Sequence, residues 1–167
     1  MRSRSKSLSG LPSSWFQVDG NCMAPLIRKD DLVMTVPVAE PTTGDIVVIT
    51  GSQPVVHRVV KVLKGDLLLT KGDMSFSLDP PLSKDSIAGK VVAIARKEGK
   101  LVLIEGRLWQ VRNYLTARYS MGCVSAWGLV RENKWLGPIG RRFSAPLKRV
   151  YISAAVVMAR LTAVQRG

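Results

Sequence analysis

Short apolar runs rich in valine and isoleucine, separated by turns that contain glycine or proline, dominate the sequence from residue 15 to residue 105. Alternation of such runs and turns is typical of β-strands, and no helical periodicity interrupts it. Two of the intervening segments, Lys64-Gly65-Asp66 and Glu98-Gly99-Lys100, have the composition of hairpin turns. We therefore expect a mainly β fold, a coiled sheet or barrel, with strands at Leu32–Val36, Ile46–Thr50, Val55–Leu63, Leu67–Thr70, Ile87–Ala95 and Leu101–Ile104.

Beyond this β region, apolar residues recur at the spacing of amphipathic helices. One group comprises Leu108, Val111 and Leu115, and a second extends from Leu147 to Leu161. Glycines and prolines are frequent between the two groups, at residues 122–146, and predict an irregular connection there. The expected organisation is a flexible basic leader, a β domain and a basic, partly helical C-terminal tail, at residues 1–14, 15–105 and 106–167 respectively.

The positive charge of the chain is concentrated in the C-terminal tail. The formal net charge is +13, from 25 Lys and Arg against 12 Asp and Glu. Residues 7–106 carry 11 basic and 11 acidic side chains, whereas residues 107–167 carry 11 basic side chains and one acidic side chain, Glu132. Such a field attracts anionic lipid, nucleic acid or an acidic protein, and composition does not choose among them.

Three interpretations of the tail remain open. Residues 141–166 place basic side chains around an apolar seam, as does a helix in peripheral contact with an anionic membrane. Packing of that seam on the β domain explains the pattern equally well. Aromatic residues interleave with arginines between residues 109 and 135, which fits base stacking. No known nucleic-acid motif accompanies them, so nucleic acid is the least favoured partner.

The sequence shows neither a secretory signal nor a membrane span. No apolar run follows the basic start of the chain, as a signal peptide requires. The stretch nearest to a membrane span, Val150–Ala159, has ten residues before Arg160 interrupts it, and a bilayer span needs about 18. We expect a cytoplasmic protein or one peripheral to the inner membrane face. The two cysteines, Cys22 and Cys123, have no metal-ligand spacing, so no metal or cofactor is expected.

One thiol, the single imidazole of the chain and two carboxylates fall within 60 residues of the β region, at Cys22, His57, Asp73 and Asp79. Nucleophilic catalysis uses these parts: an imidazole takes the proton of the thiol, and a carboxylate holds the tautomer of the imidazole. Cys22 also lies in a turn-forming stretch, where backbone N–H groups can face a developing oxyanion. Each residue alone is more often structural, so the prediction depends on their combination and order.

Four ordered segments resemble the type I signal peptidase superfamily, which includes the self-cleaving repressor domains. The nucleophile box of that family is G-x-S-M-x-P, and Gly20–Pro25 has the sequence G-N-C-M-A-P. Histidine in place of the bacterial lysine is similar to the archaeal and endoplasmic-reticulum branch. The other matching segments are G-D-I-V-V at 44–48, H-R-V-V at 57–60, K-G-D at 71–73 with an aspartate six residues later, and the closing strand at 87–94. The resemblance covers about residues 18–105.

The resemblance implies a signal-peptidase-like β catalytic domain and an endopeptidase that cleaves a peptide or a precursor protein. It gives Cys22 the place of the nucleophile, with its backbone N–H in the oxyanion hole, and His57 the place of the general base. Asp79 takes the place of the orienting carboxylate, with Asp73 as the rival for that role. The two positions that would shape the substrate wall and the turn are Met23 and Pro25.

Two departures from the family keep an alternative open. Cysteine stands where the family has serine; a Cys–His pair is a competent peptidase arrangement, but sulfur is larger than oxygen and can misplace the attack. The N-terminal membrane anchor of signal peptidases is also not seen. The alternative is a catalytically inactive peptide-binding module of the same fold, docked to a membrane or a partner through the basic tail. The few residues before Cys22 do not favour a self-cleaving repressor.

Overall fold

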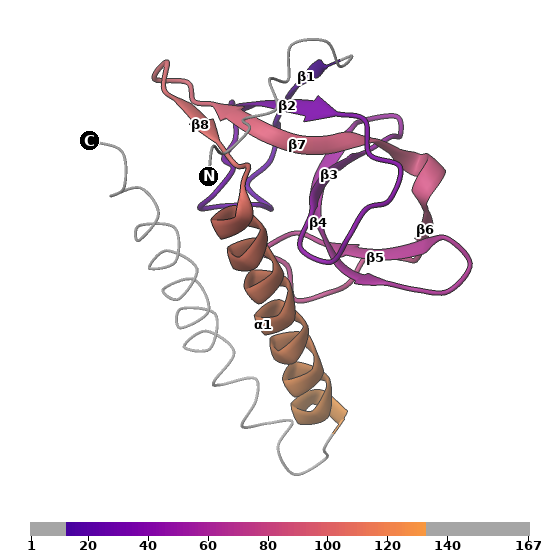
Figure 1. The fold of residues 1–167 in the computed structure, drawn as a ribbon. Helices are drawn as coiled ribbons and strands as arrows, with labels where there is room; N and C mark the ends of the chain where they lie inside the picture. The colour runs from indigo at the N-terminus through magenta and orange to yellow at the C-terminus, as the bar shows by residue number, and fades with distance from the viewer. Residues whose placement is uncertain (1–12, 133–167) are drawn as a thin grey trace, which may run out of the picture.

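A curled antiparallel sheet, a half-barrel of eight strands, forms the β region in the computed structural model, which describes residues 13–132 (Figure 1). The strand order is β1-β2-β7-β3-β4-β5-β6, and β8 pairs with β7. The predicted mainly β fold is therefore confirmed. The strands are β1 (Ser14–Gln17), β2 (Leu32–Val36), β3 (Ile46–Ile49), β4 (Val55–Val62), β5 (Leu67–Lys71), β6 (Leu82–Ser83), β7 (Ile87–Ala95) and β8 (Leu101–Leu103), with a single 3-10 turn at Lys84–Ser86.

All six predicted strands are present, and two short edge strands, β1 and β6, are additional. Neither strand has the run of apolar residues on which the sequence prediction depended. Both lie at an edge of the sheet and pair with one neighbouring strand only. Ser14, assigned above to the leader, is the first residue of β1. Both predicted hairpin turns are confirmed, and the positive φ angles of Gly65 (71°), Asp66 (60°) and Gly99 (80°) show why they need turn-forming residues.

The turn that carries Cys22 is built into the main core and held at both ends. Between β1 and β2, the chain buries Met23, Leu26 and Ile27 against the sheet. The carboxylate of Asp31 accepts the backbone N–H of Arg28 at 2.8 Å and lies 2.5 Å from Nη1 of Arg96 on β7. The backbone of this turn is thus fixed by both packing and hydrogen bonds.

The helix α1 (Arg107–Glu132) follows β8 and packs against β4. The expectation of an irregular chain from residue 122 is wrong as far as Glu132, because α1 continues through Gly122 and Gly128. A glycine inside a helix costs only about 1 kcal/mol relative to alanine, and this helix contains no proline. The predicted helix from Leu147, like the leader at 1–12 and the rest of the tail, lies outside the described residues. Within residues 13–132, no helix is both long and apolar enough to cross a membrane.

A close backbone contact fixes where α1 meets the sheet. Gly44, just before β3, has a φ of 103°, and a Cβ built on it would lie 2.7 Å from the backbone nitrogen of Tyr114. Only glycine fits this position, both for its conformation and for the space available.

A buried arginine joins the elements around this contact. Arg58 on β4 is 1% exposed, and its guanidinium forms two parallel hydrogen bonds to Asp73, at 2.8 and 2.7 Å. Nη1 also donates to the carbonyl of Gly44 at 3.1 Å and to Oδ1 of Asn113 at 2.9 Å. One side chain therefore connects β4, the loop after β5, the segment before β3 and α1.

Asp73→Ala is expected to lower the free energy of unfolding by about 3–5 kcal/mol, because it leaves the Arg58 charge buried without its counter-ion. The control is Lys97→Ala, which removes an exposed ion pair with Asp30 and should cost less than about 1 kcal/mol. Urea denaturation followed by tryptophan fluorescence measures both values. Equal losses in the two variants would contradict the anchoring role of Arg58.

Candidate active site

The imidazole of His57 is held by the carboxylate of Asp79. Nδ1 of His57, on β4, lies 2.5 Å from Oδ2 of Asp79, in the loop after β5. The same carboxylate oxygen accepts the hydroxyl of Thr70 at 2.6 Å, and the backbone N–H of Asp79 donates to the carbonyl of Thr70 at 3.0 Å. Since Nδ1 is occupied, the ring presents Nε2 to its other neighbours.

Nε2 of His57 and Cys22 lie close together beside Gly72. A Cβ built on Gly72 would lie 3.0 Å from Cβ of Cys22 and 3.2 Å from Nε2, so the three residues meet at one point. The neighbouring Cys22 is one of the groups that raise the pKa of His57. Sγ of Cys22 also lies 3.7 Å from the carbonyl oxygen of Val56. The thiol is half-buried, and the structure brings together the predicted nucleophile, base and orienting carboxylate.

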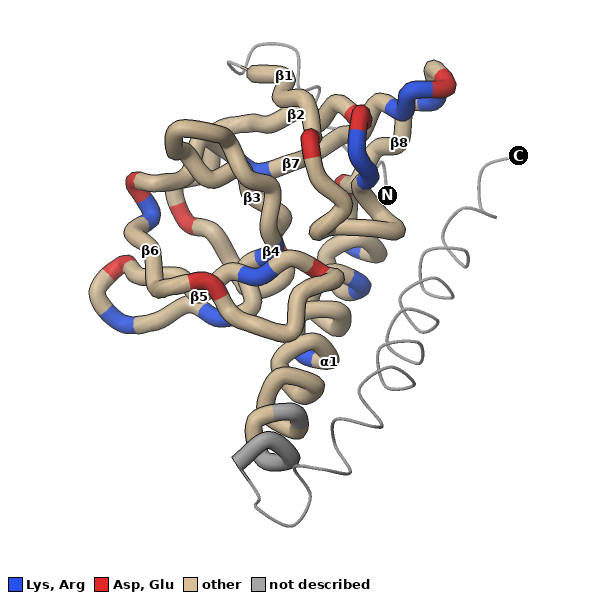
Figure 2. Tube along the Cα trace, turned by 180° about the vertical axis from the view of Figure 1, so that it is seen from behind, with Lys and Arg blue, Asp and Glu red and all other residues tan. Residues whose placement is uncertain are grey.

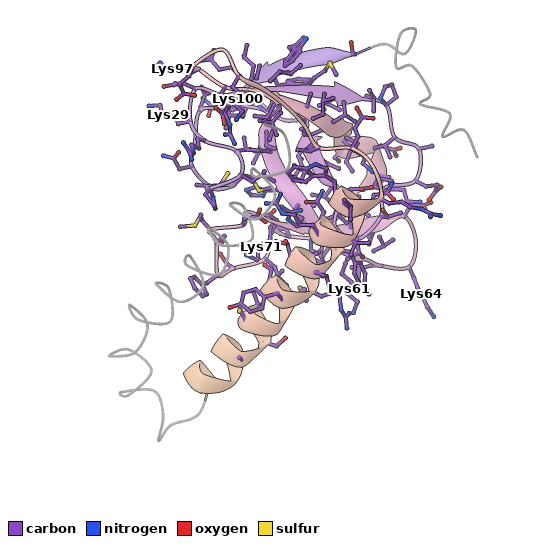
Figure 3. All side chains as sticks on the ribbon, turned by 60° about the vertical axis from the view of Figure 1, so that its left-hand side comes forward. Lys29, Lys61, Lys64, Lys71, Lys97 and Lys100 are labelled. Atoms are coloured by element: carbon purple, nitrogen blue, oxygen red, sulfur yellow. The ribbon has the colours of Figure 1, made fainter. Side chains whose placement is uncertain are left out.

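A tight turn after β5 closes one side of this arrangement. The backbone N–H of Met74 donates to the carbonyl of Cys22 at 2.8 Å, and that of Ser75 donates to the carbonyl of Gly72 at 3.0 Å. The buried ammonium of Lys71 donates to the carbonyls of Gly72 (2.8 Å) and Ser75 (2.5 Å). Figure 3 shows Lys71 within the body of the protein, whereas Lys97 and Lys100 extend outward from the β7–β8 hairpin.

The electrostatics of the site favour a protonated imidazole. Burial lowers the pKa of His57, but hydrogen bonds and negative charge from Asp79 and Cys22 outweigh burial and raise this pKa from 6.5 to about 9. Burial raises the pKa of Asp79, yet hydrogen bonds from His57 and Thr70 and nearby positive charge bring it below its ordinary value. The pKa of Lys71 falls from 10.5 to about 8, chiefly through burial. Ionised Asp79 and cationic His57 thus stabilise each other.

Two of the predicted site residues have structural positions instead. Asp73 is not the carboxylate that orients His57, because both of its oxygens are hydrogen-bonded to the guanidinium of Arg58. Met23 has no exposed surface and packs in the core beneath the turn, so its side chain does not line a substrate wall. Pro25 is half-buried within the same turn and follows a cis peptide bond.

Backbone groups beside Cys22 are positioned for a peptide. The N–H of Cys22 donates no hydrogen bond within residues 13–132, so it remains available for an oxyanion. β4 pairs with β3 from Val55, but with β5 only from Arg58 onward. The N–H of Val59 donates to the carbonyl of Asp45, on the side of β4 that faces β3. Because backbone groups alternate in direction along a strand, those of Val56 point to the opposite side of β4, where Sγ of Cys22 lies. An extended segment can pair with such an edge.

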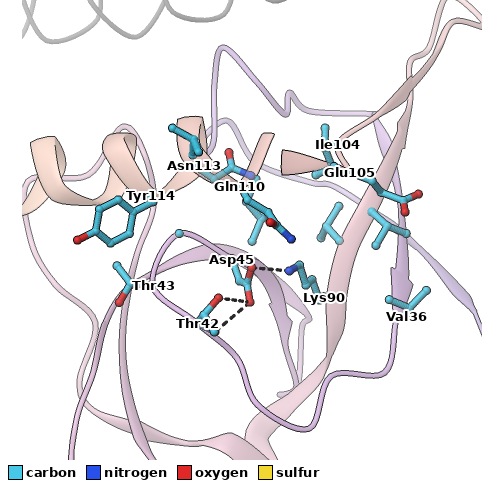
Figure 4. Close-up of a pocket in the computed structure, with 16 residues that line it drawn as sticks. Val36, Thr42, Thr43, Asp45, Lys90, Ile104, Glu105, Gln110, Asn113 and Tyr114 are labelled. Carbon is cyan, nitrogen blue, oxygen red and sulfur yellow. Dashed lines mark hydrogen bonds and ion pairs between the residues drawn. The ribbon is translucent and has the colours of Figure 1, made fainter. Parts of the chain in front are cut away.

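A separate cavity of about 770 Å³ lies between β3, β7 and the start of α1, and none of the predicted site residues lines it (Figure 4). Asp45 lies at its wall and is fully engaged: Oδ1 is 2.6 Å from the ammonium of Lys90, and Oδ2 accepts the backbone N–H and the hydroxyl of Thr42. Figure 4 shows these bonds of Asp45 to Lys90 and Thr42.

Three residues of the site were not predicted from the sequence: Thr70, Lys71 and Gly72. All three lie in or beside the K-G-D segment, but their types alone do not indicate a second hydrogen bond to Asp79 or a contact with Cys22. Among residues 13–132, no cluster of three or more His, Cys, Asp or Glu side chains could hold a metal ion. No protein-family model matches this chain, and no curated protein matches it either.

Gly72→Ala is expected to slow the alkylation of Cys22 by iodoacetamide. The added methyl group would lie 3.0 Å from Cβ of Cys22 and 3.2 Å from Nε2 of His57, and must push them apart. Displacement of this kind should lower the rate constant at neutral pH roughly tenfold. The measurement uses a Cys123→Ala background, which leaves one thiol, and mass spectrometry. Gly20→Ala is the control, because a Cβ there meets no atom within 4 Å; equal rates in all three proteins would contradict the contact.

The raised pKa of His57 also predicts a pH dependence of stability. Because the folded pKa exceeds the unfolded one, the stabilisation is complete below pH 6.5 and is lost as the pH rises towards about 9. The free energy of unfolding of the wild type, relative to His57→Gln, should fall by up to about 3 kcal/mol across this window. Chemical denaturation at several pH values tests this, and Asp79→Asn should shrink the difference. A constant difference would exclude the cationic His57.

Proposed function

We propose that this chain is a cysteine endopeptidase that acts on a peptide or precursor protein, with Cys22 as the nucleophile. One observation carries the proposal: His57 is held through Nδ1 by Asp79, at 2.5 Å, while Nε2 and Cys22 both lie beside Gly72. Nucleophile, base and orienting carboxylate are thereby in the order that acyl transfer requires. Neither a metal nor a cofactor enters the proposed reaction.

In the proposed reaction, His57 holds the proton of Cys22 as an imidazolium, and the thiolate attacks the carbonyl carbon of the scissile bond. The carbonyl oxygen becomes an oxyanion, to which the backbone N–H of Cys22 donates. The intermediate collapses to a thioester as the imidazolium gives its proton to the leaving amine. Neutral His57 then takes a proton from water, the hydroxide attacks the thioester, and the acid product leaves as the thiol is restored.

The substrate is proposed to bind as an extended strand beside the first residues of β4, before Arg58, which have no partner on β5. Its backbone would hydrogen-bond to Val56, next to the thiol, which brings the scissile carbonyl to Sγ of Cys22. Strand addition recognises the backbone of a peptide and so suits many sequences. The partner class of this proposal is therefore an unfolded or extended polypeptide segment.

A signal-peptidase-like fold is part of the same proposal. Its support is the agreement of the ordered sequence segments with a curled antiparallel sheet that brings them together: the Cys22 turn, His57 on β4 and Asp79 after β5. The glycine at position 44 of the G-D-I-V-V segment is required for a structural reason, because the backbone of α1 packs closely against it. The inactive peptide-binding module remains the second candidate, since the free edge of β4 serves peptide binding without chemistry.

An electrophilic peptide should separate the two candidates. We expect a short alanine peptide that ends in a vinyl sulfone to form a covalent adduct at Cys22, detected by mass spectrometry. Cys22→Ala should abolish the adduct, and the matched Cys123→Ala should leave it unchanged. His57→Ala should slow capture by roughly 10²-fold or more, the usual value of a positioned base.

Capture at the wild-type rate in His57→Ala would remove His57 as the base. A different pattern would favour the binding module: no adduct and no cleavage of peptides by the wild type, together with the same peptide affinity in wild type and Cys22→Ala. Peptide affinity is measured by fluorescence anisotropy. Asp79→Asn should lie between the wild type and His57→Ala, because it leaves the ring in place but removes the charge that orients it.

A further inference from the structure

The solvent-facing side of α1 is apolar, and we define this outward face by its exposed residues. Leu108, Val111 and Leu115 follow helical spacing and are 77%, 58% and 49% exposed. Tyr114 and Tyr119 are exposed beside them. At 100° per residue, these positions form one continuous stripe together with two exposed arginines. The outward face consists of Arg107, Leu108, Val111, Tyr114, Leu115, Arg118 and Tyr119.

The opposite side of α1 packs on the body through Trp109, which contacts the main core, and otherwise through small or polar residues. Asn113, Ala117 and Ser120 are buried there, and Oδ1 of Asn113 accepts the guanidinium of Arg58 at 2.9 Å. A surface helix ordinarily buries its apolar stripe and exposes its polar side. In α1 the larger aliphatic side chains are exposed instead, because the buried Arg58 needs a polar partner from the side that meets the body. The apolar stripe therefore remains outside and lacks a cover among residues 13–132.

The charge of α1 indicates what could cover this stripe. No Asp or Glu occurs between Arg107 and Arg131, and Figure 2 shows basic positions and no acidic one on the part of α1 that it colours. The outward face combines two arginines, two tyrosines and three aliphatic side chains. Arginines extend their charged ends towards lipid phosphates while their stems lie along apolar surface, and tyrosines favour the boundary between headgroups and acyl chains.

We propose that the outward face of α1 is a docking surface for an anionic lipid membrane, with the helix lying parallel to the surface. The aliphatic side chains enter the boundary of headgroups and acyl chains, and Arg107 and Arg118 bind the phosphates. This proposal does not depend on the chemistry at Cys22.

Charge disfavours the two other occupants that this chain itself could supply. Residues 133–167 carry seven basic side chains and no acidic one, so they offer no counter-charge to Arg107 and Arg118. A second copy of the chain also carries a net charge of +13. Nucleic acid would match the arginines, but leucine and valine between them make no contact of value to phosphates. An anionic bilayer matches both the charge and the apolar side chains.

Co-sedimentation of the full chain with vesicles tests the proposal. The wild type should bind vesicles of equimolar phosphatidylcholine and phosphatidylglycerol, bind phosphatidylcholine alone far more weakly, and bind less at high NaCl. Val111→Glu with Leu115→Glu should weaken binding at least about tenfold, because two charges face the acyl boundary. Leu101→Glu on β8 is the matched control, since Leu101 is 57% exposed but lies away from α1; it should bind as the wild type does.

A second variant and three further measurements complete the test. Arg107→Ser with Arg118→Ser leaves the apolar stripe intact and should reduce both binding and its salt dependence. Equal binding by wild type and both α1 double variants would overturn the proposal.

A large loss of thermal stability in Val111→Glu with Leu115→Glu would assign the face to residues 133–167, and a wild-type dimer that this variant dissociates would assign it to a second copy. Tighter binding to a single-stranded oligonucleotide than to the vesicles would assign it to nucleic acid; each of these results also overturns the proposal.

Discussion

The buried guanidinium of Arg58 is the constraint on which the rest of this structure depends. A charge with almost no access to water is stable only with a counter-ion and a full set of acceptors, and three separate segments supply them: Asp73, the carbonyl of Gly44 and Asn113 of α1. The chain therefore has to bring the loop after β5, the approach to β3 and the helix to the same point of β4. His57 is the residue before Arg58 on that strand, so the interaction that anchors the fold also fixes the backbone of the candidate base.

The same loop supplies two aspartates with different tasks. Asp73 forms the ion pair with the buried Arg58. Asp79 accepts a hydrogen bond from Thr70 and holds Nδ1 of His57. Gly72, just before Asp73, lies against Cys22, where a side chain would crowd both Cβ of Cys22 and the imidazole of His57. The anchor and the candidate catalytic pair are thus parts of one structure. Three cations lie close together in this largely buried region because each has its own anion or carbonyls: Arg58 has Asp73, His57 has Asp79, and Lys71 has the carbonyls of Gly72 and Ser75.

The polar anchoring also explains the unusual side chains on α1. A helix that must give Arg58 an amide oxygen turns Asn113 inward, and the helical period then directs Leu108, Val111 and Leu115 outward. This consequence is not visible in the sequence, where the same apolar spacing predicts only an amphipathic helix. The spacing correctly indicated a helix, but it did not indicate which face would meet the body. Nor did the glycines at 122 and 128 end the helix, because packing and the neighbouring helix formers outweigh their small cost.

The sequence by itself determined the strands, their two hairpin turns and the order of the chemical groups, because apolar periodicity and turn-forming residues act over a few neighbouring positions. It also selected Cys22, His57 and Asp79 as the residues to examine together. Only the tertiary structure decided which aspartate orients the imidazole, that Met23 is core and not a substrate wall, and that Gly72 lies beside both Cys22 and the ring of His57. The physical reason is that these outcomes depend on distances between strands and loops far apart in the chain, and on the need of a buried cation for a partner, neither of which local sequence patterns record.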